Sequence, residues 1–374
     1  MMSAHRVWRI IGGFVLLVMV SACGSGDSGS SSGGGSGGQP LSDQQRAQAA
    51  ETTASTNTQC TSLTPFYWEI GDKDGAMVSG TGGDNSSSPP SSITVMAIAS
   101  ASKWIFAAYV LEKLDISGTN PLTKDEIQLL NFTSGYHNLY DATCWLSTTV
   151  GGCFSASNPL GGNNNDQITA DIGKFYYNAG HMQALATNVI GLGGDYDNIV
   201  TTTPKLATEI ETYVGQDINL IYTNPALAGG IAMSPGMYSA FLRKILSGDL
   251  RMKNYLGVDA VCAHANSSDC PTAIYSPVNQ SAPGKSNDIN DEAWHYSLGH
   301  WVEDDPAVGD GSFSSPGADG FYPWIDASKT YYGVLARYVP IATASAAPAK
   351  EKPYVTSVYC GRLIRKAWLS GNPQ

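Results

Sequence analysis

The chain has 374 residues, 42% of them hydrophobic and 14% charged, and its 21 Lys and Arg against 32 Asp and Glu give a formal net charge of −11. A net anion without a separate basic stripe is repelled by a phosphate backbone, which argues against nucleic acid as a partner. Charged residues fall below the roughly 25% of ordinary soluble domains. The sequence therefore predicts a polar, largely uncharged surface and argues against coiled coils and long exposed helices.

The first residues have the pattern of an export signal. Arg6 and Arg9 precede the apolar run Ile10–Val20, which at about 11 residues is shorter than the roughly 20 that a membrane-spanning helix needs. The run ends Val20-Ser21-Ala22-Cys23, which resembles the bacterial lipobox, where the cysteine is acylated and becomes the mature N-terminus. This resemblance implies a signal peptide over residues 1–22 and lipidation at Cys23. The alternative is an ordinary secretory signal with an incidental cysteine.

Residues 23–58 are predicted to form a tether between that cysteine and a folded domain over 59–374. Gly24–Gly38 is almost entirely Gly and Ser, the composition of a flexible linker, and Leu41–Thr58 is polar and predicted to be loosely ordered. A G-x-S-x-G match inside the tether lacks the strand and helix of a nucleophile elbow and is set aside. The expected location is the bacterial cell envelope, with the domain lipid-anchored to the membrane and facing the periplasm or the exterior.

Six further cysteines form an even set, which in an oxidising compartment predicts three disulfides. Six cysteines allow 15 pairings. Short spacing favours Cys144–Cys153 and Cys262–Cys270, which leaves Cys60 with Cys360. The rival interpretation is a metal site, but the chain has no C-x-x-C or H-x-H spacing, so no metal is expected.

Apolar spacing and turn residues predict the secondary structure of the domain. An Asp-Gly turn joins a strand over Pro65–Ile70 to one over Ala76–Val78. Helices are predicted over Ser102–Leu114, Lys124–Asn131, His181–Ile190, Pro204–Val214, Pro235–Leu246 and Tyr359–Leu369. Further strands are predicted over Trp294–Val302, Gly320–Asp326 and Tyr331–Tyr338. Strands at both ends with helices between them predict an α+β fold, in which helices flank an antiparallel sheet built from both chain ends and a helical subdomain is inserted.

Ser100-Ala101-Ser102-Lys103 is the S-x-x-K sequence of this chain. At i and i+3 on the first turn of a helix the two side chains share a face, so the Lys103 amine can reach the Ser100 hydroxyl. The positive end of the helix favours a developing alkoxide and a neutral lysine base. Taken alone the match is weak, because an N-cap serine followed by an exposed lysine gives the same letters.

Three further matches in the same order make the chain resemble the serine β-lactamase and penicillin-binding-protein superfamily, in its class C and esterase branch. After the S-x-x-K helix, Gln128–Gly135 is similar to the branch's Leu-Leu-x-x-Thr-Ser-Gly stretch, and Tyr176-Tyr177-Asn178-Ala179-Gly180 to its Tyr-Ser-Asn motif. Ser315-Pro316-Gly317-Ala318 stands where the family has Lys-Thr-Gly or His-x-Gly. The resemblance covers roughly Cys60–Leu369 and implies a β-lactamase/transpeptidase-like fold and no cofactor.

The resemblance also implies a role for each matched residue. Ser100 would be the nucleophile that accepts the acyl group, and Lys103 with Tyr176 would remove its proton. Asn178 would bind Lys103 and the substrate, and the N–H groups of Ser100 and Ala318 would form the oxyanion hole. Tyr136-His137-Asn138 is a competing Tyr-x-Asn but lies too close to Ser100 in sequence.

The third motif departs from the family pattern because Ser315 replaces its Lys or His. Those residues grip the carboxylate of a β-lactam or a D-alanyl peptide, which a neutral hydroxyl holds much less strongly. Lys329-Thr330 does not replace the motif, because Tyr331 follows where Gly is needed, and Lys329 is interpreted as a turn residue. The strand segment with His295 and His300 resembles one wall of the family's cleft, and both histidines are interpreted as packing residues, with substrate contact as the alternative.

These residues favour a serine hydrolase that forms a Ser100 acyl-enzyme, most simply on an ester or amide with a neutral acyl group, with Ser315, Gly317 and Ala318 beside the substrate. A D,D-peptidase or β-lactamase is the second hypothesis. The third is an inactive envelope lipoprotein that binds rather than reacts.

Overall fold

The computed structural model describes residues 41–192, 203–265, 267–279, 292–343 and 351–374. The predicted signal peptide, Cys23 and the Gly/Ser stretch lie outside these ranges, so their expected roles stay predictions. Within the described ranges, no helix is both long and apolar enough to cross a bilayer.

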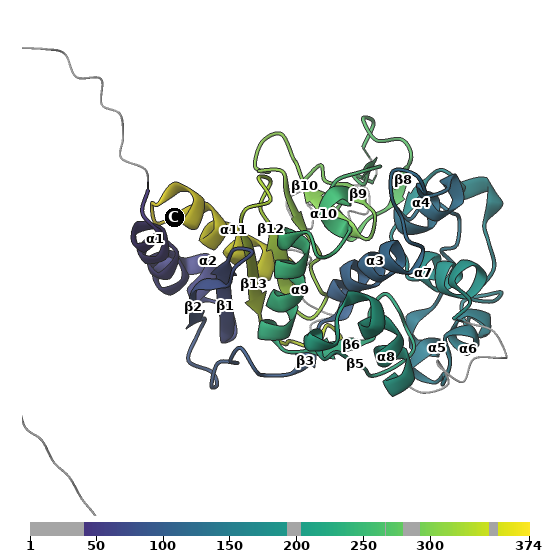
Figure 1. Cartoon of the computed structure of the whole chain (residues 1–374), viewed down its shortest axis with the longest axis horizontal. Helices are drawn as coiled ribbons and strands as arrows, with labels where there is room; N and C mark the ends of the chain where they lie inside the picture. The colour runs from purple at the N-terminus through teal and green to yellow at the C-terminus, as the bar shows by residue number, and fades with distance from the viewer. Residues whose placement is uncertain (1–40, 193–202, 266, 280–291, 344–350) are drawn as a thin grey trace, which may run out of the picture. The chain divides into compact units, whose positions relative to one another are not determined.

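The folded unit begins at Leu41 and not at residue 59, because the segment expected to be loose is helix α1 (Asp43–Thr56). Ser42 caps this helix in a capping box with Gln45. Its alanines are buried against α11 (Pro353–Ser370), and the Arg46 guanidinium donates to the Trp368 and Leu369 carbonyls at 2.9 and 3.1 Å. Helices α1 and α11, from opposite ends of the described domain, therefore lie side by side (Figure 1).

One eight-stranded antiparallel sheet joins both ends of the chain, as the sequence predicts. Its order is β2-β1-β13-β12-β11-β10-β9-β7, and Tyr67 of β1 pairs with Ala336 of β13. The strands are β1 (Phe66–Gly71), β2 (Ala76–Gly82), β7 (Val261–Cys262), β9 (His295–Ser297), β10 (His300–Glu303), β11 (Ser312–Ser314), β12 (Tyr322–Ile325) and β13 (Tyr332–Ala336). Helix α11 packs against β12 and β13.

The single strand predicted over Trp294–Val302 is instead a hairpin of β9 and β10. Gly299 makes the turn with a φ of 76°, which a glycine adopts at little cost. A Cβ on Gly299 would clash with the Ala107 Cβ on helix α3 (Ser102–Lys113), so the hairpin approaches that helix closely. This hairpin brings the aromatic residues beside it toward the helix that carries Lys103.

Between the sheet-forming ends lies the predicted helical insertion, centred on the buried helix α3 (Ser102–Lys113). The other helices are α2 (Thr58–Thr61), α4 (Lys124–Leu130), α5 (Asp141–Trp145), α6 (Val150–Ser155), α7 (Gly180–Leu185), α8 (Thr203–Val214), α9 (Pro235–Ser247) and α10 (Met252–Tyr255). Short helical turns are η1 (Ala99–Ala101), η2 (Thr169–Asp171), η3 (Ala186–Ile190), η4 (Gln216–Ile218) and η5 (Pro277–Asn279). Small sheets are formed by β3 (Met96–Ala97), β6 (Ile231–Met233) and β5 (Ile221–Tyr222), and by β4 (Phe175–Tyr176) with β8 (Ala273–Tyr275).

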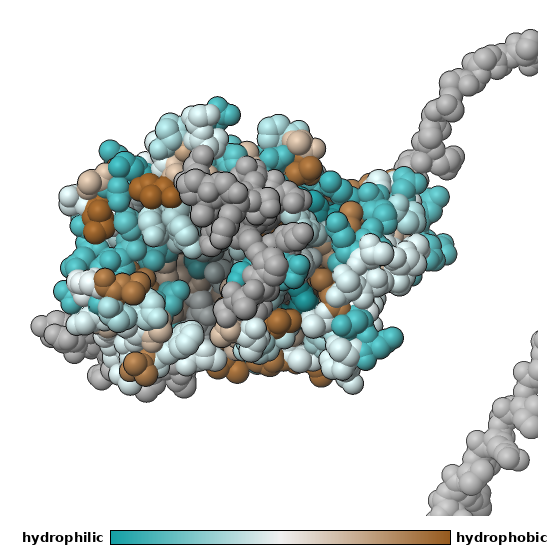
Figure 2. All heavy atoms as spheres, turned by 180° about the vertical axis from the view of Figure 1, so that it is seen from behind, coloured by the Kyte–Doolittle hydropathy of each residue, from teal (hydrophilic) through white to brown (hydrophobic). Residues whose placement is uncertain are grey.

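The six cysteines pair as the spacing argument predicts, into Cys60–Cys360, Cys144–Cys153 and Cys262–Cys270. The first bridge joins α2 to α11 across 300 residues of sequence. On the face seen in Figure 2, hydrophilic residues predominate and hydrophobic ones stand in small separate groups, in keeping with the predicted polar surface.

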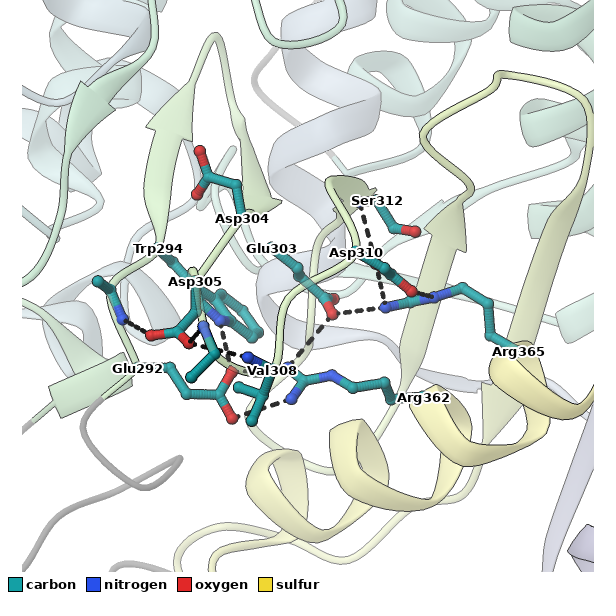
Figure 3. Close-up of polar contacts among 12 residues, drawn as sticks. Glu292, Trp294, Glu303, Asp304, Asp305, Val308, Asp310, Ser312, Arg362 and Arg365 are labelled. Atoms are coloured by element: carbon teal, nitrogen blue, oxygen red, sulfur yellow. Dashed lines mark hydrogen bonds and ion pairs between the residues drawn. The ribbon is translucent and has the colours of Figure 1, made fainter. Parts of the chain in front are cut away.

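A buried ionic network connects α11 to the β10–β11 hairpin (Figure 3). Glu303 accepts hydrogen bonds from Arg362 at 3.4 Å and Arg365 at 2.9 Å, and Arg365 also binds Asp310. Two N–H groups of Arg362 bind the two carboxylate oxygens of Glu292 at 2.9 and 2.8 Å. Removing one partner of such a buried pair typically costs about 3–5 kcal/mol, since the other charge is left without compensation.

Candidate active site

Ser100 lies in turn η1, immediately before α3, at the helix mouth that the sequence predicts. The preceding residue, Ala99, has a φ of 44°, in the left-handed region that L-residues other than Asn and Asp seldom occupy. The Ser102 hydroxyl donates to the Ala99 carbonyl at 2.7 Å and accepts from the Ile231 N–H at 3.3 Å. These contacts hold a strained turn that presents a half-buried Ser100 side chain, as strain at functional sites often does.

Lys103 lies on the first turn of α3 and its Nζ is 2.9 Å from the Ser100 Oγ. The Nζ also lies 2.9 Å from the Ala228 carbonyl oxygen, to which it donates. Burial lowers the pKa of Lys103 to about 8, although the negative charge of Asp141 acts in the opposite direction. An amine with that pKa is partly neutral near pH 8, so its lone pair can take the Ser100 proton.

The structure shifts the site tyrosine by one residue: Tyr177, and not Tyr176, lies beside Ser100. Tyr177 and Ser100 line the same pocket, the Trp301 ring stacks on the Tyr177 ring at 5.2 Å between centroids, and the Lys103 Nζ is 4.8 Å from the centre of the Tyr177 ring. Neighbouring residues of an extended segment point to opposite sides. Tyr176 therefore faces away from Ser100, and its ring stacks on His137 and Tyr275 at 4.1 and 5.1 Å between centroids.

Burial raises the pKa of Tyr177, and the polar groups of Ser100 and Trp301 nearby offset this only in part. The hydroxyl is therefore protonated at neutral pH. The resemblance implied that the lysine and a tyrosine remove the Ser100 proton together, but here the pKa of the lysine is lowered and the pKa of the tyrosine is raised. The arrangement suits Lys103 as the base and Tyr177 as a neutral hydrogen-bond donor.

Asn178 is not brought to Lys103. Its amide N–H group donates to the Leu139 carbonyl at 3.1 Å, and its Oδ1 accepts from the Gly180 N–H at 2.8 Å, at the start of α7. The competing Tyr-x-Asn also lies elsewhere, since Tyr136 packs on Phe154. Asn178 is therefore a structural residue in this fold. It does not take the role beside Lys103 that the resemblance implies.

The third-motif segment lies directly against the nucleophile. The buried Ser315 hydroxyl donates to the backbone carbonyl of Ser100 at 3.0 Å. Gly317 is required here because a Cβ would come within 2.2 Å of the Ile98 carbonyl oxygen. The N–H of Ala318 makes no hydrogen bond within the described part of the chain, so it is available, together with Ser100, to a developing oxyanion.

A pocket of about 90 Å³ opens beside Ser100, and its walls are mainly aromatic and aliphatic. It is lined by Ser100, Tyr177, Pro277, Val278, Trp294, Trp301, Pro316, Ala318 and Tyr354. None of these lining residues is Lys, Arg or His. The pocket therefore offers apolar contact and backbone donors next to the nucleophile, and its lining within the described ranges holds no cation for a carboxylate.

Lys329, His300 and His295, for which the sequence allowed either a structural or a substrate-binding role, each make contacts within the fold. Lys329 is in the turn between β12 and β13 with a φ of 57°. His300 is buried, stacks on Trp104 at 5.5 Å between centroids, and accepts from the Gly257 N–H; burial lowers its pKa to about 4. His295 forms an ion pair with Asp304, which raises its pKa.

Three residues around the nucleophile were missed by sequence reasoning: Tyr177, Trp301 and Asp141. Trp301 follows the Gly299 turn and stacks on Tyr177 at 5.2 Å between centroids. Asp141 begins α5 and acts electrostatically on both Lys103 and Tyr177. The resemblance marks the segment that ends at Trp301 as a cleft wall without giving Trp301 itself a role, and nothing in the local sequence marks Asp141. Over the described ranges, no three His, Cys, Asp or Glu side chains group as metal ligands.

The depressed pKa of Lys103 predicts the pH dependence of ester turnover. Below about pH 8 the amine is protonated and cannot accept the Ser100 proton, so kcat/KM should rise about tenfold per pH unit and level off above that value. Initial rates on a neutral ester, measured from pH 5.5 to 9.5 and corrected for spontaneous hydrolysis, check this. A profile that is flat between pH 6 and 9 would contradict Lys103 as the base.

No protein-family model matches the sequence, and no curated protein sequence is significantly similar to it. Solved structures do match its fold. A D-amino acid amidase from Ochrobactrum anthropi SV3 superposes with a TM-score of 0.53 at 12% identity, over 82% of this chain and 96% of its own. A simvastatin synthase variant from Aspergillus terreus gives 0.53 at 14% identity, over 87% and 99% of the two chains. A Bacteroides dorei protein provisionally described as a beta-lactamase gives 0.52 at 18% identity, over 83% and 95%.

These similarities establish the fold, which is that of the serine β-lactamases and transpeptidases, as the sequence resemblance implies. Identities of 12–18% do not by themselves carry an activity. The activity has to be argued from the side chains around Ser100.

Proposed function

We propose that this chain is a serine hydrolase that works through a Ser100 acyl-enzyme on an ester or amide whose acyl group carries no charge. The observation that supports this most is the 2.9 Å contact between the Lys103 Nζ and the Ser100 Oγ, combined with a lysine pKa of about 8. An isolated structural lysine gains nothing from burial next to a serine hydroxyl. A base of this pKa beside a nucleophile on a strained turn is the arrangement that acyl transfer needs.

In the proposed acylation, the Ser100 oxygen forms a bond to the carbonyl carbon while its proton moves to the Lys103 amine. The N–H groups of Ser100 and Ala318 stabilise the negative charge on the former carbonyl oxygen. The bond to the alcohol or amine then breaks, and the leaving group takes the proton from Lys103, with Tyr177 donating a hydrogen bond. Water repeats the sequence in the second half, which releases the acid and regenerates Ser100.

The neutral character of the substrate is supported by Ser315. Its hydroxyl hydrogen is engaged by the Ser100 carbonyl, so it is poorly placed to bind a carboxylate, and among the described residues the pocket lining supplies no cation. A D,D-peptidase or β-lactamase would need such a group. We further propose that the mature protein is anchored through a lipidated Cys23 in the bacterial cell envelope, which intact-mass measurement of the membrane-extracted protein would test.

Mass spectrometry of the purified domain, incubated separately with a short-chain p-nitrophenyl ester and a labelled penicillin, tests the activity. We expect ester turnover through a transient Ser100 adduct and no lasting penicillin adduct. Ser100→Ala should abolish turnover. A stable Ser100 penicilloyl adduct would instead assign the protein to the peptidase class, and absence of reaction with both reagents would leave the binding lipoprotein as the better account.

A further inference from the structure

The pocket beside Ser100 has a wall whose position is set by the buried ionic network, and this links the network to substrate choice. Trp294 lines the pocket and is itself almost fully buried. Its indole N–H donates to the Glu292 carboxylate at 2.8 Å. Figure 3 shows that the same carboxylate is gripped by the Arg362 guanidinium.

Each contact on Trp294 restricts its ring. The Glu292 carboxylate fixes the N–H edge, the Arg362 guanidinium lies 5.6 Å from the ring centre, and Trp301 packs edge-on at 5.8 Å between centroids. Glu292 cannot move without breaking two charge-assisted hydrogen bonds to Arg362. These three contacts hold the Trp294 ring in place, so Trp294 is a fixed wall on its side of the pocket.

The size and polarity of the pocket define what it accepts. Its volume of about 90 Å³ is about three times the ~30 Å³ share of one liquid water and less than the ~150 Å³ cavity that holds benzene. A group of about two to four carbons fills that space. The walls are apolar apart from Ser100 and the tyrosine hydroxyls, so burial of methylene groups is the main source of affinity.

We propose that this pocket binds a compact, uncharged apolar group of the substrate, with Trp294 as the specificity-determining residue and Glu292 as its positioning residue. The proposal rests on the function proposed above and names its substrate class. The group lies on one side of the scissile bond, either in the acyl part or in the leaving part. Trp294 sets how long it can be.

Two series of neutral esters test this, one varying the acyl chain from two to eight carbons and the other varying the alcohol. In one of the two series, kcat/KM should increase about fourfold per methylene up to about four carbons and then stop rising. Trp294→Ala should move that limit to longer chains. No dependence on length in either series, or an unchanged limit in Trp294→Ala, would overturn the proposal.

Variants of the buried ionic network distinguish an effect on the position of Trp294 from an effect on the stability of the whole fold. Glu292→Leu removes the acceptor for the indole and should shift the chain-length limit as Trp294→Ala does, while Glu292→Gln keeps an acceptor and should largely restore it. Asp310→Asn weakens the far side of the same network, at Arg365, and should lower the melting temperature without shifting the limit. If Glu292→Leu does not fold, the chain-length limits of Trp294→Ala and Asp310→Asn are compared instead. The proposal then requires a shifted limit in the first variant and an unchanged limit in the second.

The outcomes distinguish this proposal from the one on which it rests. Wild-type protein that turns over neither the esters nor the corresponding amides refutes the proposed hydrolase. Wild-type protein that turns over all esters equally, with activity lost in Ser100→Ala, retains the hydrolase and refutes the pocket.

Discussion

Replacing Lys103 by Met should lower kcat/KM for a neutral ester by about 10³-fold, within the range that positioned general bases contribute. The physical reason is the loss of the amine 2.9 Å from the Ser100 hydroxyl, which leaves no side chain to take its proton during attack. Steady-state rates and the burst amplitude on a p-nitrophenyl ester measure the effect. The Ser100 adduct should form too slowly to accumulate.

Two comparisons make this result specific. Lys103→Arg keeps a cation but not a removable proton, because a guanidinium stays charged, and should be nearly as inactive. If Lys103→Arg kept a tenth or more of the activity, the lysine would be acting as a charge and not as a base. The Met variant should melt at the same temperature as wild type or higher, because Lys103 is buried and an apolar side chain there costs no desolvation.

Tyr177→Phe should lower kcat by about 10²-fold, whereas Tyr176→Phe should change it by only a few fold. Phe at 177 preserves the ring contacts with Phe132, Tyr296 and Trp301 and removes only the hydroxyl. The two variants lose the same atom from adjacent residues, so each is the control for the other. Parallel melting curves exclude a folding effect.

The reverse ranking, with Tyr176→Phe the more damaging, would restore the tyrosine that the motif match suggests. Equal and small effects would mean that Lys103 works alone. A useful second readout is the leaving group: loss of the Tyr177 donor should slow esters of poor leaving groups more than those of good ones.

The sequence predicted the fold because its strongest signals are local and mutually consistent. The predicted helix over Ser102–Leu114 agrees with α3 to one residue, since a run of buried side chains at helical spacing has few other solutions. The prediction that Leu41–Thr58 is loosely ordered was wrong, because a polar segment can still form a helix that packs through small side chains. Helix α1 buries alanines, which leave little hydrophobic pattern, and its capping box at Ser42 and Gln45 was the available signal.

The sequence predicted those parts of the site whose residues are close together along the chain. Ser100 and Lys103 share one helical turn, and their contact follows from spacing alone. Choosing between adjacent tyrosines requires knowing which side of the segment faces Ser100, and that depends on His137 and Tyr275, which occupy the other side. Trp301 and Asp141 reach the site only through folding, so no spacing rule could place them.

The joining of both chain ends into one sheet has a consequence for how the molecule reaches its native state. Strand β1 gains its partner β13 only when the C-terminal part of the chain is present, and the Cys60–Cys360 bridge joins positions 300 residues apart. Such pairings give a high contact order, and closing so long a loop slows folding. The β1–β2 hairpin therefore has an unpaired edge until β13 is available, and α3 likewise depends on α8, 100 residues further along the chain, for part of its packing. We expect the nucleophile to be completed late, when the segment bearing the third motif closes against Ser100.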